Sequence, residues 1–301
     1  STSTRYSQNK TLDQTGNTVG SYGSGFRAAG QLGRQDVRQA EVCAMDMWKF
    51  YEITHREHVL CNPMSSEKLS RLVGLLRLPE SARVVDVACG KGEFLIRLAE
   101  AYSVHGTGID LSPFFIAAAQ KQLEVRAPDA DITFQEMDGA DFRPDKPHSF
   151  ALASCIGASW VFGGHAATLE ALSTMVEPGG WVVVGEPYWL RDPHEDYLEA
   201  SGVARGDFET HSGNVEAGEL QGLELVHTLV SNADEWDTYE GLQWYATAEH
   251  ARSHQDDQDL PELLERVAKQ KATYLRWGRD TLGWAIYVFR RGVLQDSYSV
   301  A

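Results

Sequence analysis

Basic residues are scarce in this sequence, and long apolar runs are absent from it. Lys and Arg together number 27 against 43 Asp and Glu, which gives the 301 residues a formal net charge of −16. A surface this acidic repels phosphate backbones, so we expect no nucleic-acid partner. The apolar stretches are far shorter than the roughly 20 residues that a membrane-spanning helix needs, so we expect no membrane partner. A soluble protein is the class that remains.

Cysteine is scarce as well. The sequence has four cysteines: Cys43, Cys61, Cys89 and Cys155. Their spacing matches neither a zinc site nor a disulfide framework, and no other group of ligand residues has metal-binding spacing. Residues 1–10 hold no apolar segment of the kind that a signal peptide carries. We therefore expect free thiols, no bound metal and a cytoplasmic protein.

The composition of the sequence changes along the chain. Residues 1–35 are rich in Ser, Thr, Gly, Gln and Asn, which predicts a flexible N-terminal arm. Residues 36–301 are enough for one sizeable core, so we expect a single domain there. We divide it into a helical cap (36–78), a ligand-binding core (79–190) and a C-terminal part with further strands and a helical insert (191–301). The oligomeric state does not follow from the sequence.

Short apolar runs alternate with helical patterns between residues 79 and 190. The strands that these runs predict cover residues 83–88, the segment ending at Asp110, 132–135, 149–155 and, after a turn at 177–180, 181–184. Such alternation predicts an α/β fold with a doubly wound parallel sheet. Two later strands, 223–230 and 282–289, with helices between them at 234–254 and 260–276, predict an antiparallel edge.

A turn containing glycine follows the first predicted strand, in the segment Val84–Phe94. Gly90 and Gly92 let a ligand approach the backbone there, and the start of the next helix offers free N–H groups. Ligands of doubly wound sheets bind at this edge. A dinucleotide-binding turn would have a third glycine where this sequence has Leu95. The turn therefore predicts a ligand site that differs from a dinucleotide site.

Carboxylates surround this turn. Asp86 lies within the first strand, and Glu93 follows Gly92 directly. Both would repel a pyrophosphate and attract a cationic ligand. Asp110 ends the second strand, where a carboxylate can accept from both hydroxyl groups of a ribose. Asp138 follows the third strand and can accept from an adenine amino group. The pattern predicts a site for a positively charged nucleoside without phosphate.

These motifs resemble those of the class I S-adenosylmethionine-dependent methyltransferases. The matching features are the segment Asp86–Gly92, the acid that ends the second strand, the Asp138-Gly139 pair and the Pro-Gly-Gly turn before the fifth strand. Further segments between residues 55 and 290, among them Gly185–Trp189, resemble the bacterial YjhP-type methyltransferases. The resemblance implies a Rossmann-like, seven-stranded sheet with a reversed last strand. It also implies S-adenosylmethionine as cofactor and S-adenosylhomocysteine as product.

The resemblance assigns cofactor contacts to residues at the ends of four strands. These residues are Asp86, Ala88, Gly90, Gly92, Asp110, Leu111, Asp138, Gly139, Cys155 and Ile156. The first four would line the methionine end, and Asp110 would hold the ribose with Leu111 against the adenine. The next pair would meet the adenine edge, and the last pair would face the methyl donor.

An acceptor pocket is expected over the ends of the fourth and fifth strands, where aromatic residues gather. The expected lining residues are Trp160, Phe162, His165, Tyr188, Trp189, Trp236 and Tyr239. Aromatic walls are typical of small-molecule pockets and can stabilise a cation. For Trp236 and Trp284, packing in the core is an equally good interpretation. His165 also has the alternative role of capping the helix that follows it.

Three residues are candidates for catalysis. Glu186 follows the fifth strand and could orient an amine or hydroxyl group or act as a weak base. A capping or salt-bridging role is the alternative. His55 and His58 lie one helical turn apart and could reach the site from the cap as a base or substrate ligand. A solvated helix end is the more common explanation for such a pair.

We therefore hypothesise an enzyme that transfers a methyl group from S-adenosylmethionine to a small-molecule acceptor at O, N, S or C by in-line displacement. A nicotinamide-dependent oxidoreductase on a similar sheet is one alternative, although the missing third glycine and the carboxylates Asp86 and Glu93 argue against it. A module that binds S-adenosylmethionine without catalysis is the other alternative. The acceptor and its attacked atom do not follow from the sequence.

Overall fold

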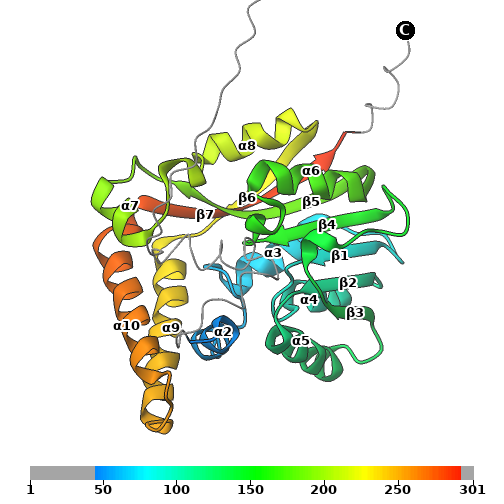
Figure 1. Ribbon diagram of the computed structural model, residues 1–301. Helices are drawn as coiled ribbons and strands as arrows, with labels where there is room; N and C mark the ends of the chain where they lie inside the picture. The colour runs from blue at the N-terminus through cyan, green and yellow to red at the C-terminus, as the bar shows by residue number, and fades with distance from the viewer. Residues whose placement is uncertain (1–44, 293–301) are drawn as a thin grey trace, which may run out of the picture.

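A seven-stranded sheet forms the centre of the computed structural model, which describes residues 45–292 (Figure 1). The strand order is β3-β2-β1-β4-β5-β7-β6. The strands are β1 (Arg83–Val87), β2 (His105–Asp110), β3 (Asp131–Glu136), β4 (Phe150–Ile156), β5 (Val176–Trp189), β6 (Leu223–Val230) and β7 (Leu282–Arg291). Strands β1 to β5 are parallel, and β7 is antiparallel to both of its neighbours. The predicted doubly wound sheet with a reversed last strand is confirmed. The predicted arm, residues 1–35, lies outside the described residues.

Helices cover both faces of the sheet. Helices α3 (Ser66–Leu76) and α4 (Glu93–Ala101) pack in a core cluster on one face, with α5 (Pro113–Arg126) beside α4. Helices α6 (His165–Met175) and α8 (His211–Leu220) contribute to the cluster on the other face. Burial on both faces explains the continuous apolar character of the central strands.

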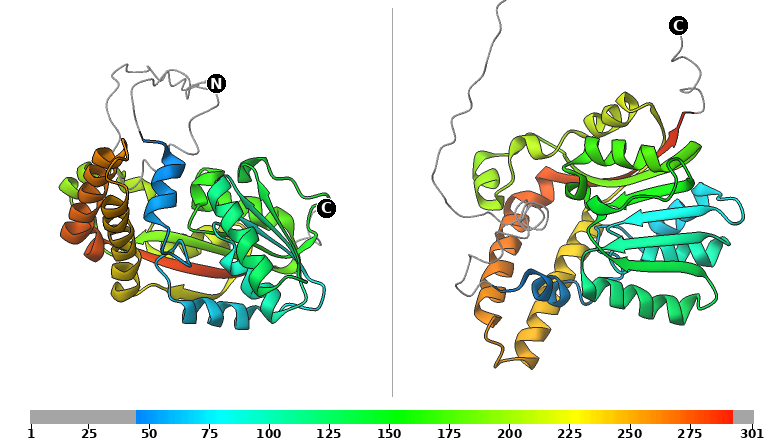
Figure 2. Two further views of the ribbon diagram at one scale, coloured as in Figure 1. Left: turned by 90° about the horizontal axis from the view of Figure 1, so that it is seen from below. Right: turned by 45° about the vertical axis from the view of Figure 1, so that its right-hand side comes forward.

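A helical pair stands beside the sheet, between β6 and β7 in the chain. It consists of α9 (Ala233–Ser253) and α10 (Leu260–Thr273), and α2 (Met47–Thr54) contacts α9 (Figures 1 and 2). A π-helical segment, Tyr274–Gly278, and the short α11 (Arg279–Thr281) lead from α10 into β7. This pair is the predicted helical insert before the last strand. None of the helices within residues 45–292 has the length and apolar character to cross a bilayer.

The fifth strand is longer than predicted. The pattern predicted a turn at 177–180 and a strand at 181–184, whereas β5 runs from Val176 to Trp189. The Pro-Gly-Gly segment lies within the strand at a register shift, because Phe150 pairs with Val176 and Leu152 pairs with Trp181. The carboxyl half of β5 continues because β7 pairs with it as far as Trp189.

The segment between β5 and β6 also holds two helices that the sequence analysis did not predict. They are α7 (Glu195–Ser201) and α8. The α8 sequence contains two glycines, which lower helix propensity, so its apolar pattern is weak. Its packing against α6, β5 and β6 stabilises it instead.

Candidate active site

A first pocket lies at the carboxyl ends of β1 to β4. Eight of the ten residues predicted to contact a cofactor line it: Asp86, Ala88, Gly90, Asp110, Leu111, Asp138, Gly139 and Ile156. Parallel strands end at one edge of the sheet, so residues far apart in the sequence meet there. The structure thus brings together most of the predicted cofactor residues.

The other two predicted residues, Gly92 and Cys155, do not line the first pocket. Gly92 has φ +75, and a Cβ on it would lie 2.5 Å from Cζ of Phe134, so this glycine permits close packing against β3. Cys155 is fully buried in the core cluster on the α6 side. Successive side chains of a strand point to opposite faces, so Ile156 reaches the pocket and Cys155 does not. The first pocket therefore reaches neither Gly92 nor the side chain of Cys155.

The turn after β1 is held in a strained conformation. Ala88 and Gly90 both have φ of 56, in the region that glycine favours. Such strain in a residue with a Cβ costs about 1–3 kcal/mol and is typical of ligand sites. A Cβ on Gly139 would lie 2.4 Å from Cγ1 of Val87, so Gly139 is required where the loop after β3 crosses β1. The backbone is therefore available to a ligand at both strand ends.

The carboxylate of Asp110 is fixed by backbone groups. Its Oδ2 accepts from the N–H of Gly90 at 2.8 Å, and its Oδ1 accepts from the N–H of Ser112 at 2.8 Å. Burial raises the pKa of Asp110, and these hydrogen bonds lower it again. Each oxygen keeps a lone pair for a further donor. The arrangement fits the two hydroxyl groups of a ribose.

Asp86 is a buried carboxyl group that has no positive partner within residues 45–292. It is 3% exposed and accepts a hydrogen bond of 2.6 Å from the hydroxyl of Ser154. Burial raises its pKa to about 7, the bond from Ser154 lowers it, and the charge of Asp110 raises it. A cation in the pocket would stabilise the ionised form. The first pocket therefore fits a positively charged nucleoside such as S-adenosylmethionine.

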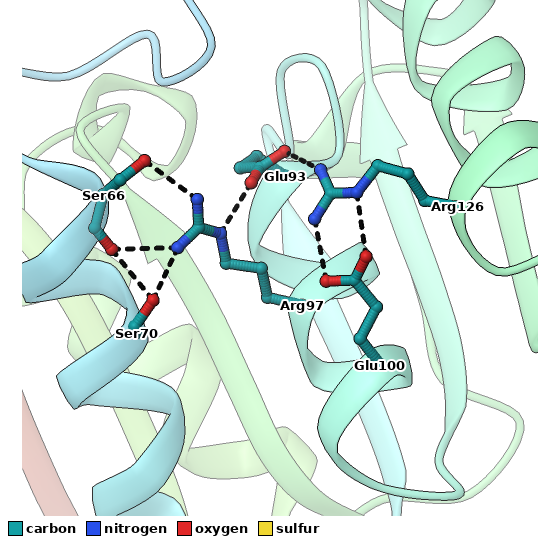
Figure 3. A network of polar contacts seen from close by, with 6 residues as sticks. All are labelled: Ser66, Ser70, Glu93, Arg97, Glu100 and Arg126. Carbon is teal, nitrogen blue, oxygen red and sulfur yellow. Dashed lines mark hydrogen bonds and ion pairs between the residues drawn. The ribbon is translucent and has the colours of Figure 1, made fainter.

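Glu93 lines the first pocket, but its carboxylate is paired with two arginines rather than left as a free charge. Its Oε1 accepts from Nε of Arg97 at 2.6 Å, and its Oε2 accepts from Nη1 of Arg126 (Figure 3). Arg97 also donates to the Oγ atoms of Ser66 and Ser70 at 2.9 and 2.7 Å. This network neutralises Glu93 and joins α4 to α3 and α5.

Hydrogen bonds from Lys91 join the loop that follows β1 to the turn after α2. Its Nζ donates to the backbone carbonyls of His55, Arg56 and His58 at 2.7, 3.1 and 2.8 Å.

Asn62 lies in the segment after this turn, and a Cβ on Gly157 would be 2.1 Å from its Oδ1. The sequence analysis gave neither Lys91 nor Asn62 a role, because no local pattern relates them to the carbonyls or the glycine they contact.

His55 and His58 are buried, at 5% and 3% exposed, so a solvated helix end is the wrong interpretation. The hydroxyl of Thr54 donates to the carbonyl of Phe50, so Nδ1 of His55 donates to Thr54 at 3.0 Å. Nε2 of His55 then accepts from the hydroxyl of Tyr239 at 3.1 Å. Nε2 of His58 donates to the Tyr239 carbonyl at 2.8 Å. Burial lowers the pKa of both histidines, that of His58 to about 4.

A second pocket adjoins the first and has a volume of about 1000 Å³. The two pockets share wall residues: Tyr51, His55, Cys61, Asn62, Gly157, Trp160, Val161, Tyr239 and Trp284. The predicted residues Trp160, His165, Trp236 and Tyr239 line the second pocket, and His58 lines neither. Trp284 is 3% exposed, so it belongs to both the core and the pocket wall.

Three predicted wall residues lie elsewhere. Phe162 packs against the core cluster on the α6 side. Tyr188 is buried in that cluster, with its ring 4.9 Å from that of His211. Trp189 donates from Nε1 to the carbonyl of Arg205 at 2.9 Å. None of the three lines either pocket, and β5 continues to Trp189, so Tyr188 and Trp189 are strand residues rather than loop residues.

Glu186 of β5 lines the second pocket beside His165. Glu186 is 4% exposed, its Oε2 has no hydrogen-bond partner, and burial raises its pKa to about 8, against the effect of a hydrogen bond from Ser159. Nε2 of His165 donates to the carbonyl of Asn214 at 3.0 Å, and Nδ1 lies 4.0 Å from Oε2 of Glu186. Within residues 45–292, Glu186 pairs with no Lys or Arg. Its expected salt-bridging role is therefore not seen in this part of the chain.

No group of three or more His, Cys, Asp and Glu side chains within residues 45–292 could hold a metal ion. Cys61, Cys89 and Cys155 are free thiols, and Cys43 lies outside the described residues. Both pockets therefore depend on carboxylates, imidazoles, aromatic rings and backbone groups.

Comparisons with known proteins agree with this site. Residues 84–180 match the family model of a methyltransferase domain. The YjhP protein of Escherichia coli (strain K12) is 31% identical over 245 residues, which cover 81% of this chain and 98% of YjhP. The solved YjhP structure has a TM-score of 0.75 with this one and 30% identity, covering 80% of this chain and 98% of that chain.

Two further relatives carry informative names. A methyltransferase from Geobacter sulfurreducens, solved in complex with S-adenosylhomocysteine, has a TM-score of 0.75 at 30% identity and covers 80% of this chain and 97% of its own. The dTDP-3-amino-3,4,6-trideoxy-alpha-D-glucopyranose N,N-dimethyltransferase of Streptomyces venezuelae is 30% identical over 51% of this chain and 63% of that enzyme. The similarity to YjhP spans nearly that whole protein, and the strand ends fit the cofactor, so the chain belongs to the family of class I S-adenosylmethionine-dependent methyltransferases, in the group that includes YjhP.

Proposed function

We propose that this methyltransferase methylates a small-molecule acceptor that binds in the second pocket. The observation that carries the proposal is the shared wall: nine residues line both pockets, so a molecule in the second pocket adjoins one in the first. The volume of the second pocket, about 1000 Å³, lies at the upper end of the range for small-molecule sites.

The first pocket is the proposed place of the cofactor. S-adenosylmethionine supplies a methyl group on a sulfonium, which is already activated for displacement. The carboxyl group of Asp86 would balance the positive charge, Asp110 would hold the ribose, and Asp138 and Gly139 would meet the adenine edge. These roles use carboxyl groups that the fold keeps buried or fixed to the backbone, so little reorganisation is needed on binding.

The cap residues would exclude water and align the acceptor. Tyr239 and His55 are joined by a hydrogen bond and line both pockets, so they connect α9 with the turn after α2 over the reacting groups. Alignment supplies much of the acceleration in a displacement of this type. Glu186 and His165 are the buried groups that would take up a proton from an acceptor that loses one.

A small acceptor is supported by charge and by one relative. The chain carries a net charge of −16, which repels nucleic acid. The Streptomyces venezuelae relative is named for a sugar nucleotide, which is a small molecule. Family membership also decides against the nicotinamide-dependent and non-catalytic alternatives.

A labelling experiment tests the proposal. Wild-type protein is incubated with S-adenosylmethionine labelled in its methyl group and a cell extract filtered to retain only small molecules. Gln243→Trp would fill the second pocket from α9, while Tyr245→Trp changes an exposed residue of the same helix that lines neither pocket. We expect label in small molecules with wild type and Tyr245→Trp, and none with Gln243→Trp, while all three bind S-adenosylhomocysteine. Label transfer that survives in Gln243→Trp would contradict the proposal.

A further inference from the structure

Several residues that line the second pocket carry a buried hydrogen-bonding atom without a partner within residues 45–292, and two of these atoms lie next to each other. They are Oε2 of Glu186 and Nδ1 of His165, and they lie 4.0 Å apart. Both side chains are at least nine-tenths buried, at 4% and 9% exposed. A separation of 4.0 Å is too long for a hydrogen bond between them. Buried polar atoms are nearly always paired, so these two atoms have hydrogen-bonding capacity that a ligand group can use.

The protonation of His165 follows from its other contact. Nε2 must donate, because its partner is the carbonyl oxygen of Asn214. Burial lowers the pKa of His165, so the ring is neutral near pH 7 and Nδ1 carries a lone pair. Asn214 is itself held in place by donating from Nδ2 to the carbonyl of Pro187 and the hydroxyl of Tyr287, both at 3.1 Å. Nδ1 is therefore a fixed hydrogen-bond acceptor that faces the second pocket.

The charge around the pair favours a cation. Besides Glu186, four acids line the second pocket: Asp207, Glu209, Glu216 and Glu240. Within residues 45–292, Arg266 is the permanent cation that lines it, and its guanidinium lies over the ring of Phe50, 3.7 Å from the centroid. A cationic group would enter this field readily and convert Glu186 to the carboxylate that burial disfavours.

The hydrogen-bonding pattern selects the kind of cation. Once a cation has ionised Glu186, its carboxylate oxygen and the imidazole lone pair of His165 both accept, so the cationic group must donate at least two hydrogen bonds. An ammonium group does so, whereas a hydroxyl group has a single hydrogen. The rings of Trp160, Trp236 and Tyr239 line the same pocket and can stabilise a positive charge.

We propose that the second pocket takes a small amine, whose N–H groups are bound jointly by Glu186 and His165. The inference rests on the proposed function, because it names the acceptor class for the same pocket. For the amine nitrogen itself to be methylated, the ammonium first passes one proton to the Glu186 carboxylate, which leaves the nitrogen a lone pair for the attack on the methyl group. The inference assigns Glu186 the role of the charged partner and His165 the role of the second acceptor. Asn214 is a positioning residue that fixes the ring of His165.

Two probes with one skeleton test the inference: 2-phenylethylamine, which is protonated at pH 7, and 2-phenylethanol. Their dissociation constants are measured by titration calorimetry with the protein saturated by S-adenosylhomocysteine. We expect the amine to bind the wild type at least about tenfold more tightly than the alcohol, because only the amine forms the charged pair. In Glu186→Gln the preference should fall to about one. In the control Glu216→Gln, which changes an exposed acid on the same pocket, the preference should persist.

Each outcome of these titrations either supports or overturns the inference. Equal binding of the two probes, a preference for the alcohol, or no binding of the amine to the wild type would overturn it. A preference that survives in Glu186→Gln would overturn the assignment to Glu186, provided that this variant binds S-adenosylhomocysteine as the wild type does. If Glu186→Gln does not fold, the ratio of the two probes on the wild type still decides the outcome. Failure of the proposed function is seen separately, as loss of label transfer to small molecules.

Discussion

The ammonium group of Lys91 donates to the carbonyl oxygen of His55 at 2.7 Å, although 36 residues separate them. The same ammonium also donates to the carbonyls of Arg56 and His58. Lys91 stands between the two glycines of the cofactor loop, so the loop and the cap are one connected unit. A substitution that alters the cofactor loop should therefore also affect the cap, and the reverse.

Replacing Lys91, which also lines the first pocket, with Met should therefore weaken cofactor binding by releasing the cap from the cofactor loop. Three carbonyls lose a charged donor, which costs about 1–3 kcal/mol when such groups are buried. We expect the affinity for S-adenosylhomocysteine, measured by calorimetry, to fall about tenfold. Lys121→Met, on the exposed side of α5, is the control and should bind normally. Unchanged affinity in Lys91→Met would show that loop and cap are independent.

Gly157→Ala should displace the cap from the end of β4. Gly157 has φ +86, and an added Cβ would lie 2.1 Å from Oδ1 of Asn62. We expect a loss of unfolding free energy of about 1–3 kcal/mol, together with loss of methyl transfer. Gly241→Ala, in α9 with open space around its Cβ, should stabilise the protein by about 0.5–1 kcal/mol. Denaturant unfolding of both variants measures the difference, and equal stabilities would refute the role of Gly157.

Glu93→Gln should affect stability more than cofactor affinity. The variant leaves Arg97 and Arg126 without the carboxylate that now accepts from both. Removing one partner of such a network costs about 3–5 kcal/mol when it is buried, and less here because both arginines are partly exposed. We expect the affinity for S-adenosylmethionine to change little, because both oxygens of the carboxylate already accept from the arginines. A large loss of affinity in a stably folded Glu93→Gln would restore the original expectation for Glu93.

The stability of the ligand-free enzyme should depend on pH through Glu186. Burial raises its pKa to about 8, above the usual value of 4.5, so the folded protein binds more protons than the unfolded chain between these values. The contribution of Glu186 to stability is complete below pH 4.5 and is lost as the pH rises towards 8, with a size on the order of 5 kcal/mol. The melting temperature of wild type should thus fall more between pH 5 and 8 than that of Glu186→Gln. Glu216→Gln should behave like wild type, and identical profiles for all three would contradict the raised pKa.

The candidate cofactor residues at the strand ends could be predicted from the sequence because they depend on local patterns. Asp86, Asp110 and Asp138 each follow or end a short apolar run, and a parallel sheet brings such positions to one edge. The length of β5 could not be read in the same way. The Pro-Gly-Gly segment looks like a turn, but Val176 before it and Trp181 after it both pair with β4, so it lies within a strand. Pairing with β7 then extends β5 through Tyr188 to Trp189.

Contacts between distant segments were beyond any local pattern. Glu186 could be selected from its position after a strand, but its neighbour His165 depends on the way α6 packs against β5. The bonds of Lys91 and the contact of Asn62 with Gly157 likewise exist only once the cap has folded over the sheet. Such partners have no spacing rule, because their sequence separation is set by the fold.

Calorimetric titration with S-adenosylmethionine and, separately, with S-adenosylhomocysteine tests the central claim most directly, on wild type, Asp110→Ala and the exposed control Asp141→Ala. Asp110 accepts from the backbone of Gly90 and Ser112 at the centre of the first pocket. We expect saturable binding of both ligands to wild type and to Asp141→Ala, and a loss of affinity of about tenfold or more in Asp110→Ala. A folded wild type that binds neither ligand, or a folded Asp110→Ala that binds both normally, would contradict the account.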